Sequence, residues 1–349
     1  MKRKNITSIL IAVFIIVSVS SCSGDKSGTK EAKAPLKDIT TKAVEPLVDK
    51  ETQLLLDDLE ENGDYVNSRL FPSLIKGASV SDGSESNTYI IDIRSADEFT
   101  KGRIKGSVNV KFSDLLDFLI NDIKPFEYNR IVMVSNDGQL AAYTTSLLRL
   151  MGYGNVYALR WGISGWSKEF AETGWLAGCS SEYQSELETV INDKPGASGM
   201  PILATGLSFG EEIGAKRFKD LFNEDPAYVM IDAALVFASP SDYYIINYDR
   251  RDKYESGHIR GAVRYKPGAT LGIINEMSTI PAGKTVVVYC GTGHNSGFVT
   301  AYLRLFGYDA RTLRYGNNGF MYEKMKAEKA SLSWLPFSQN DIGNFEIIK

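Results

Sequence analysis

The chain has 349 residues, a formal net charge of −4, 43% apolar residues and 23% charged residues. This composition is typical of a soluble globular protein, and the length is sufficient for about two domains. The small negative charge gives no electrostatic reason to expect a nucleic-acid partner. The sequence contains no glycine-rich phosphate loop and no cysteine pair with metal-ligand spacing, so we expect neither a metal site nor another cofactor.

The first residues are expected to form a secretory signal and not part of the fold. Three basic residues, 2–4, precede an apolar stretch over 6–19, which is shorter than the about 20 residues that a membrane span needs. The stretch ends in Val-Ser-Ser-Cys22, which resembles the lipobox of bacterial lipoproteins. That resemblance implies cleavage before an acylated Cys22, a lipid anchor, and a location in the cell envelope facing the periplasm or exterior. The alternative is ordinary cleavage near Ser21 with a free Cys22.

An internal repeat organises the rest of the chain. The segment YIIDIRSADEFTKGRIKGSV at 89–108 is matched by YIINYDRRDKYESGHIRGAV at 244–263, and IVMVSNDGQLAAYTTSLLRLMGY at 131–153 by VVVYCGTGHNSGFVTAYLRLFGY at 286–308. Both pairs have the same offset of 155 residues, and LRWGISGW from Leu159 is repeated as LRYGNNGF from Leu313. The chain therefore contains two copies of one domain.

Each copy alternates short apolar strands with amphipathic helices, as in 131–134 followed by the helix that Gly152 closes. This order predicts an α/β fold in which each domain has a parallel sheet with helices on both faces. The expected segments are a signal peptide at 1–21, a tether at 22–60, domain 1 at 61–178, a connector at 179–212, domain 2 at 213–336 and a C-terminal tail at 337–349.

The counterpart of Asp92 in the second copy is ambiguous. The shared frame of the repeat aligns Asp92 with Asn247, but residues 228–232 also form an apolar run that ends in aspartate, after a helix expected at 213–222. We favour Asp232, which would make 233–247 an insertion.

These motifs resemble the rhodanese family, from about residue 62 to 335. The resemblance lies in Asp92-Ile93-Arg94, Glu98-Phe99, the Gly-x-Ile-x-Gly turns at 102–106 and 257–261, and the loop Cys290-Gly291-Thr292-Gly293-His294-Asn295-Ser296. It implies a tandem sulfurtransferase whose second domain has the nucleophile, Cys290. That cysteine would take sulfane sulfur from a small donor such as thiosulfate and pass it to a thiol or cyanide acceptor.

The residues around Cys290 support this role on physical grounds. Cys290 follows an apolar strand and begins a loop that enters a helix, so backbone N–H groups and the helix N-terminus should surround its sulfur and lower its pKa. The loop over 291–296 has no arginine or lysine, in contrast to many family members, so this effect should be modest. His294 is expected to be an exposed loop residue, and the hydroxyls of Thr292 and Ser296 either bind the persulfide or cap the loop.

The remaining candidates are expected to be structural. In copy one, Ser135 stands at the nucleophile position, and neighbouring Asp137 would repel an anionic substrate, so domain 1 should be a structural or docking partner. Asp92 and Arg94 should form an internal ion pair, and His258 should be a hydrogen-bonded structural residue. Cys179 is expected to be inert, with a resolving thiol as the alternative. The tryptophans expected to pack between sheets and helices are Trp161, Trp166 and Trp175.

Two other functions stay open. One is a non-catalytic rhodanese-like module that binds a partner or senses sulfur or redox species through Cys290. The other, a cysteine phosphatase, is disfavoured because it needs an arginine to clamp phosphate, and Asn295 stands where that arginine would be useful.

Overall fold

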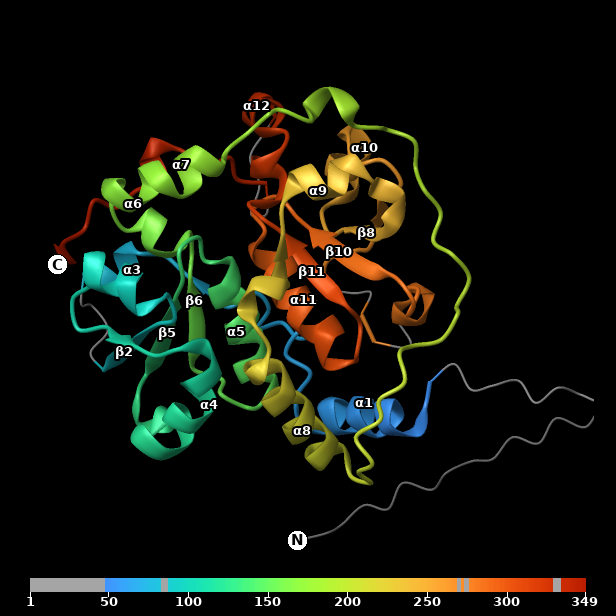
Figure 1. The fold of residues 1–349 in the computed structure, drawn as a ribbon, viewed down its shortest axis with the longest axis horizontal. Helices are drawn as coiled ribbons and strands as arrows, with labels where there is room; N and C mark the ends of the chain where they lie inside the picture. The colour runs from blue at the N-terminus through green and yellow to red at the C-terminus, as the bar shows by residue number, and fades with distance from the viewer. Residues whose placement is uncertain (1–47, 83–86, 269–270, 273–275, 329–333) are drawn as a thin grey trace, which may run out of the picture. The chain divides into compact units, whose positions relative to one another are not determined.

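A computed structural model of the chain describes residues 48–82, 87–268, 271–272, 276–328 and 334–349. Its two parallel five-stranded sheets, one for each copy of the repeat, confirm the expected fold class (Figure 1). The first sheet has the order β1 (Leu74–Ile75), β6 (Val156–Leu159), β5 (Arg130–Val134), β2 (Thr88–Asp92), β4 (Val108–Asn109). The second has the order β7 (Met230–Ile231), β11 (Ala310–Leu313), β10 (Thr285–Tyr289), β8 (Tyr243–Asn247), β9 (Val263–Arg264).

Both faces of each sheet are buried. Successive side chains of the central strands point to opposite faces, and each face packs in its own apolar cluster. In β5, Ile131 and Met133 face a large core, while Val132 and Val134 pack on the opposite side. In β10 the same division holds, with Val286 and Val288 in the large core. Near-continuous apolar strands of this kind are typical of parallel sheets buried on both faces.

Helices α5 (Gln139–Leu150) and α11 (His294–Leu305) lie side by side between the two sheets (Figure 1). They approach closely at small residues: a Cβ on Gly297 would lie 2.9 Å from the carbonyl oxygen of Gln139. The other helices are α1 (Lys50–Asn62), α2 (Ala78–Ser81), α3 (Ala96–Lys101), α4 (Leu115–Asp117), α6 (Lys168–Thr173), α7 (Trp175–Gly178), α8 (Gly210–Asn223), α9 (Ala233–Ala238), α10 (Arg251–Ser256) and α12 (Tyr322–Ala327). The large core contains residues of both domains, so the two copies share one apolar interior.

Sheet pairing settles the counterpart of Asp92. β2 and β8 occupy the same place in their sheets, and in each the last residue, Asp92 or Asn247, pairs with the last residue of the central strand. Asp232 instead follows β7, the counterpart of β1. The expectation that Asp232 replaces Asp92 is therefore wrong, and residues 233–247 are not an insertion, since they include α9 and β8.

Helix α1 occupies residues that we expected in the tether. Asp49 caps it through N–H groups of residues 51 and 52, and Leu55 and Leu59 are buried. The apolar positions spaced along this helix pack against α8. The folded part of the chain therefore begins before residue 61.

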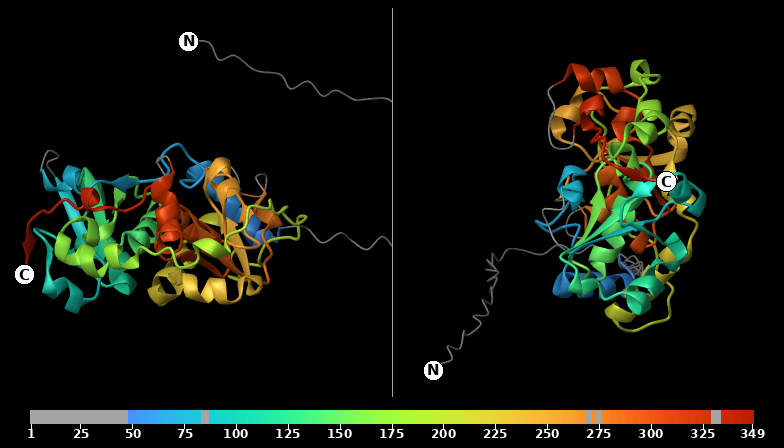
Figure 2. Two further views of the ribbon diagram at one scale, coloured as in Figure 1. Left: turned by 90° about the horizontal axis from the view of Figure 1, so that it is seen from above. Right: turned by 90° about the vertical axis from the view of Figure 1, so that its left-hand side faces the viewer.

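The connector and the C-terminal tail both return to the domains. Residues 179–212 run along domain 2, where Glu188 forms an antiparallel bridge with His258. After domain 2, the tail crosses to domain 1, and β12 (Ile347–Ile348) pairs antiparallel with β3 (Arg103–Ile104) (Figure 2).

Candidate active site

Cys290 lies directly after β10 in a tight loop that leads into α11. Gly293 makes the turn with a φ of 74°, which places the following residues in the helix. The backbone N–H groups of Thr292 and Ser296 act to lower the pKa of the thiol, and its Sγ lies 3.8 Å from Ser296 Oγ. The loop therefore forms the backbone cradle that the sequence predicts around this sulfur.

Domain 1 has the equivalent loop around a hydroxyl. Ser135 Oγ accepts hydrogen bonds from the N–H groups of Gly138 and Ala141, at 3.1 and 3.2 Å. Ala141 is the counterpart of Ser296 in the repeat. The two loops thus have one architecture, and their nucleophile positions differ in a single atom, oxygen in Ser135 and sulfur in Cys290.

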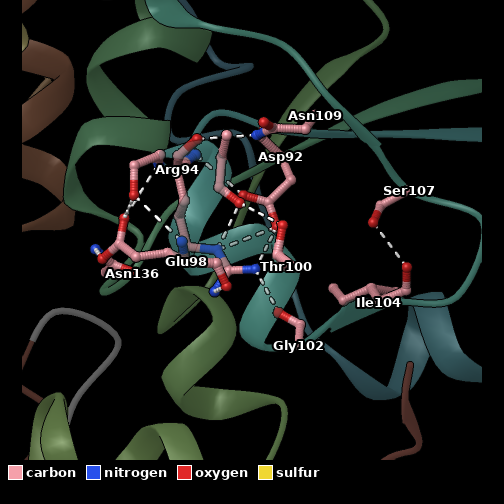
Figure 3. A network of polar contacts seen from close by, with 11 residues as sticks. Asp92, Arg94, Glu98, Thr100, Gly102, Ile104, Ser107, Asn109 and Asn136 are labelled. Atoms are coloured by element: carbon pink, nitrogen blue, oxygen red, sulfur yellow. Dashed lines mark hydrogen bonds and ion pairs between the residues drawn. The ribbon is translucent and has the colours of Figure 1, made fainter. Parts of the chain in front are cut away.

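The Asp-x-Arg motif is intact in domain 1 only. Arg94 donates to Asp92 through Nε and Nη2 and also reaches the carbonyl of Gly102, while Asn136 donates to Glu98 (Figure 3). The buried pair, with 2.6 Å between Arg94 Nη2 and Asp92 Oδ2, confirms the expected ion pair.

In domain 2 the position of Arg94 is occupied by Asp249, a residue that our sequence analysis missed. Its carboxylate is buried and accepts hydrogen bonds from Gly291 N at 3.1 Å and Asn317 Nδ2 at 3.0 Å. Burial raises the pKa of Asp249 to about 7. The cysteine loop of domain 2 is therefore contacted by a carboxyl group, Asp249, at the position where domain 1 has the cation Arg94.

The expected low pKa of Cys290 is wrong in this structure. The side chain is completely buried, and burial, followed by the charge of Asp249, raises the pKa of the thiol above its ordinary value. The N–H groups of Ser296 and Thr292 act in the opposite direction but do not offset these two effects. The sequence analysis considered the N–H groups that lower the pKa of this thiol. It missed the burial of the sulfur and the carboxylate of Asp249, which both raise that pKa.

His294 is also placed differently from the expectation, because it is buried. Its Nε2 accepts a hydrogen bond from Trp161 N of domain 1 at 3.2 Å, and its Nδ1 lies 2.9 Å from Thr292 Oγ1. The ring stacks on Trp175, with 5.8 Å between ring centroids. Burial, with a smaller contribution from the charge of Arg160, lowers the pKa of His294 to about 3, so the ring is neutral.

The contact of His294 has a counterpart in the other domain. Gln139 begins α5 as His294 begins α11, and its Oε1 accepts a hydrogen bond from Tyr315 N at 2.7 Å. Trp161 and Tyr315 are themselves equivalent, and both have positive φ, 67° and 61°. Each loop is therefore in contact with a left-handed turn of the opposite domain. We refer to these two contacts, His294 with Trp161 and Gln139 with Tyr315, as the cross-brace.

The other loop residues have separate roles. Thr292 Oγ1 contacts His294, and Ser296 Oγ contacts Gly293 O and Thr312 Oγ1, so both hydroxyls fasten the loop. Gly291 is held by Asp249 and by Asn318, which donates to its carbonyl. Asn295 is partly exposed and lines a cavity of about 440 Å³ outside the loop.

The candidates outside the loop are mostly structural, as expected. His258 is buried, its Nδ1 lies 2.8 Å from Tyr254 O, and its ring stacks on Tyr254. Burial raises the pKa of Cys179 to about 12, and its sulfur lies 4.0 Å from Asn318 Oδ1. Trp166 packs on the first sheet, but Trp161 and Trp175 lie against His294 at the domain junction.

Cys22 and the signal segment lie outside the described residues. Within the described part of the chain, no helix is long and apolar enough to cross a membrane.

Comparison with known proteins gives the family. The model of the rhodanese-like domain matches residues 78–169 and 215–323, together more than half of the chain. YibN from Escherichia coli K12, an uncharacterized protein, is 24% identical over 86 residues, which are 25% of this chain and 60% of YibN. A tRNA uridine(34) hydroxylase from Prochlorococcus marinus strain MIT 9215 is 32% identical over 111 residues, 30% of this chain and 33% of the relative.

Among solved structures, a thiosulfate sulfurtransferase from Pseudomonas aeruginosa is similar at a TM-score of 0.27 and 17% identity, covering 75% of this chain and 46% of that one. The chain thus spans less than two thirds of each of these proteins. The two matched segments contain every strand of the two five-stranded sheets except β1, and the chain belongs to the rhodanese-like family as a tandem of two such domains.

Proposed function

We propose that the protein is a sulfurtransferase that carries sulfane sulfur as a persulfide on Cys290. The observation that carries the proposal is the position of Cys290, directly after β10 and in the loop that begins α11, where the N–H groups of Thr292 and Ser296 act to lower the pKa of its thiol. Backbone N–H groups and a helix N-terminus stabilise negative charge, both on a thiolate and on the outer sulfur of a persulfide.

The proposed reaction has two balanced steps. The Cys290 thiolate, after its proton is released to the buffer, attacks the outer sulfur of thiosulfate. A new S–S bond forms, the donor S–S bond breaks, and sulfite leaves with the bonding electron pair. Cyanide or a thiolate then attacks the outer sulfur of the persulfide, and Cys290 leaves as the thiolate. Neither step needs an oxidant or a reductant.

In this proposal domain 1 positions the site and performs no chemistry. Ser135 fills the equivalent cradle, and no charged base touches its hydroxyl among the described residues. The contribution of domain 1 is the turn at Trp161, which closes over the cysteine loop through His294.

The second candidate function is a module that binds a partner or senses sulfur or redox species through Cys290 without turnover. It is favoured by the complete burial of Cys290 and by the raised pKa of its thiol, since the thiol is a far weaker nucleophile than the thiolate.

Intact-mass measurement on the reduced full chain separates the two functions. After incubation with thiosulfate or polysulfide, we expect the wild type and Ser135→Ala to gain the mass of one sulfur atom, and Cys290→Ser to gain none. Added cyanide should remove the extra sulfur and yield thiocyanate. A wild type that gains no sulfur from either donor would contradict the proposed enzyme and favour the sensing module.

We also propose that an acylated Cys22 anchors the protein in the cell envelope. The support for this is the resemblance of residues 19–22 to a lipobox behind a short apolar segment.

A further inference from the structure

A second cavity lies at the carboxyl ends of β2 and β4, the edge of a parallel sheet at which ligands usually bind. Its volume of about 640 Å³ is within the size range of pockets that hold organic ligands. The repeat relates it to the cavity of about 440 Å³ beside the cysteine loop. At the offset of 155 residues, its lining residues Phe112, Ser113 and Pro226 are the counterparts of Pro267, Gly268 and Phe71.

The two cavities differ in the residues beside them. The cavity of domain 2 borders the cysteine loop through Thr292, His294 and Asn295. The described residues that line the cavity of domain 1 include none from the serine loop over 135–140, and Arg94, Ser95 and Ala96, which follow β2, line it instead. A ligand in this cavity would therefore not contact Ser135, and the cavity is suited to binding without reaction.

The inner wall of this cavity is apolar and firmly packed. Ile93 and Phe112 both line it, and their exposed fractions are 5% and 3%. Phe112 packs on Phe222 of α8, with 5.2 Å between the ring centroids. This contact fixes the segment after β4 against the end of α8, so the two segments that line the cavity are held together in the absence of a ligand.

Four of the described lining residues are charged, and two of these are already neutralised. Arg94 pairs with Asp92, with 2.6 Å between Arg94 Nη2 and Asp92 Oδ2. Glu224 pairs with Arg304 of α11. Neither group is therefore free to determine the charge of a ligand.

Lys111 and Asp225 are the other two charged residues, and they come from the two segments that Phe112 and Phe222 hold together. Within the described part of the chain, neither has an oppositely charged group within 4.0 Å. Asp225 Oδ1 accepts a hydrogen bond from Ala227 N at 2.9 Å, which orients the carboxylate. A ligand in the cavity would thus meet one positive group, one negative group and an apolar wall.

We propose that this cavity binds a free α-amino acid with an apolar side chain. The carboxylate of the amino acid pairs with Lys111, its ammonium group pairs with Asp225, and its side chain packs against Ile93 and Phe112. A simple anion or a simple cation would leave one of the two charges unmatched. Domain 1 thereby has a ligand of its own, separate from the chemistry at Cys290.

Ligand-detected NMR titration of the full chain measures the binding, with L-phenylalanine as the probe. Hydrocinnamate lacks its ammonium group, phenethylamine lacks its carboxylate, and L-serine retains both charges but has no apolar side chain. We expect L-phenylalanine to bind about fivefold or more tightly than each of these three compounds, because each loses one of the three contacts.

Variants of the lining residues locate the site. Lys111→Met and Asp225→Asn should each weaken L-phenylalanine binding by about fivefold or more. Asparagine retains the oxygen that accepts from Ala227 N, so this turn is kept. Ala96→Trp, at an exposed position that begins α3, should remove detectable binding by filling the cavity. Lys266→Met is the matched control, because Lys266 is the counterpart of Lys111 in domain 2, and its affinity should stay within about twofold of the wild type.

Equal affinity of the wild type, Lys111→Met and Asp225→Asn overturns the proposal. So does equal affinity of the wild type for L-phenylalanine and hydrocinnamate, a comparison that does not depend on the folding of any variant. Binding that persists in Ala96→Trp would place the ligand outside this cavity and refute the site. Persulfide formation, measured by intact mass on the same samples, should be equal in Ala96→Trp and the wild type, since the cavity is separate from Cys290.

Discussion

Asp249 is the residue that most changes the chemistry of the cysteine loop. In domain 1, the equivalent Arg94 neutralises Asp92, but in domain 2 the pair has become Asn247 and Asp249. The carboxylate has no cation within 4.0 Å among the described residues and is held by one backbone and one amide N–H. It therefore introduces negative charge where a thiolate must form.

Asp249→Asn should stabilise the protein in a pH-dependent way. Burial raises the pKa of Asp249 from 3.8 to about 7, so its ionisation favours the unfolded chain as the pH rises between these values. Unfolding free energies measured from pH 4 to pH 8 should show a growing advantage of the variant, on the order of 4 kcal/mol by pH 8. Asp232→Asn, at an exposed carboxylate, is the control. An advantage independent of pH would refute a buried ionisation at Asp249.

The same variant has a second readout at the sulfur. Removing the negative charge should lower the pKa of the Cys290 thiol, so iodoacetamide should label it faster at a given pH. Asparagine can fit the site, since Asn317 Oδ1 has no hydrogen-bond partner among the described residues and could accept from the new amide. Identical labelling profiles in the wild type and Asp249→Asn would mean that the charge of Asp249 does not affect the pKa of the Cys290 thiol.

At the scale of elements, the cross-brace joins the start of each central helix to a left-handed turn of the opposite domain. His294 and Gln139 perform the same task with different side chains. The difference matters because only the imidazole titrates. A protonated His294 can no longer accept from Trp161 N, and its charge would be buried beside Trp175.

His294→Gln should remove an acid sensitivity of the fold. The pKa of His294 is lowered from 6.5 to about 3, so its contribution to stability is complete above pH 6.5 and is lost as the pH falls towards 3. Between pH 7 and pH 5, the wild type should therefore lose about 2 kcal/mol of unfolding free energy relative to the variant, since the effect of Asp249 is common to both. Denaturant unfolding at both pH values measures it. His258→Gln, at a buried histidine outside the brace, is the control, and an unchanged pH response in His294→Gln would contradict the assignment.

Most elements could be predicted from the sequence because their signals are local. The central strands are continuous apolar runs, and the helices after them have a glycine at their end. The position of Asp232 could not be resolved in this way. Both β7 and β8 are apolar runs that end before or at a polar residue, and only their pairing with β11 and β10 assigns their places in the sheet.

At the scale of the whole molecule, the two copies belong to one compact unit, Glu45–Lys349. The large core includes Tyr143 of α5 and Phe298 of α11, and Ser146 Oγ donates to Phe298 O across the junction at 2.9 Å. The offset of 155 residues between the two copies aligns Arg94 with Asp249 and Asp137 with Thr292, so these two differences could have been predicted from the sequence. It could not predict that Arg160 and His294 meet, because the packing of two equivalent domains against each other leaves no local signal in the sequence.

The lipid anchor that we propose at Cys22 concerns the whole molecule as well. If Cys22 is acylated, Cys22→Ala should move the protein from the membrane fraction to the soluble fraction or leave it unprocessed, while Cys179→Ala should not change its partition. Fractionation and the mass of the N-terminal peptide check this. Equal membrane partition of the wild type and Cys22→Ala would exclude a lipid anchor at this cysteine.

Strand β12 imposes an order on folding during synthesis. Its partner β3 belongs to domain 1, yet Ile347 and Ile348 are translated only after all of domain 2. Among the described strands, β3 pairs only with β12, so it stays without a strand partner while more than 200 residues, 105–346, leave the ribosome. Domain 1 is therefore translated before domain 2, but one of its strands can pair only after domain 2 has been made.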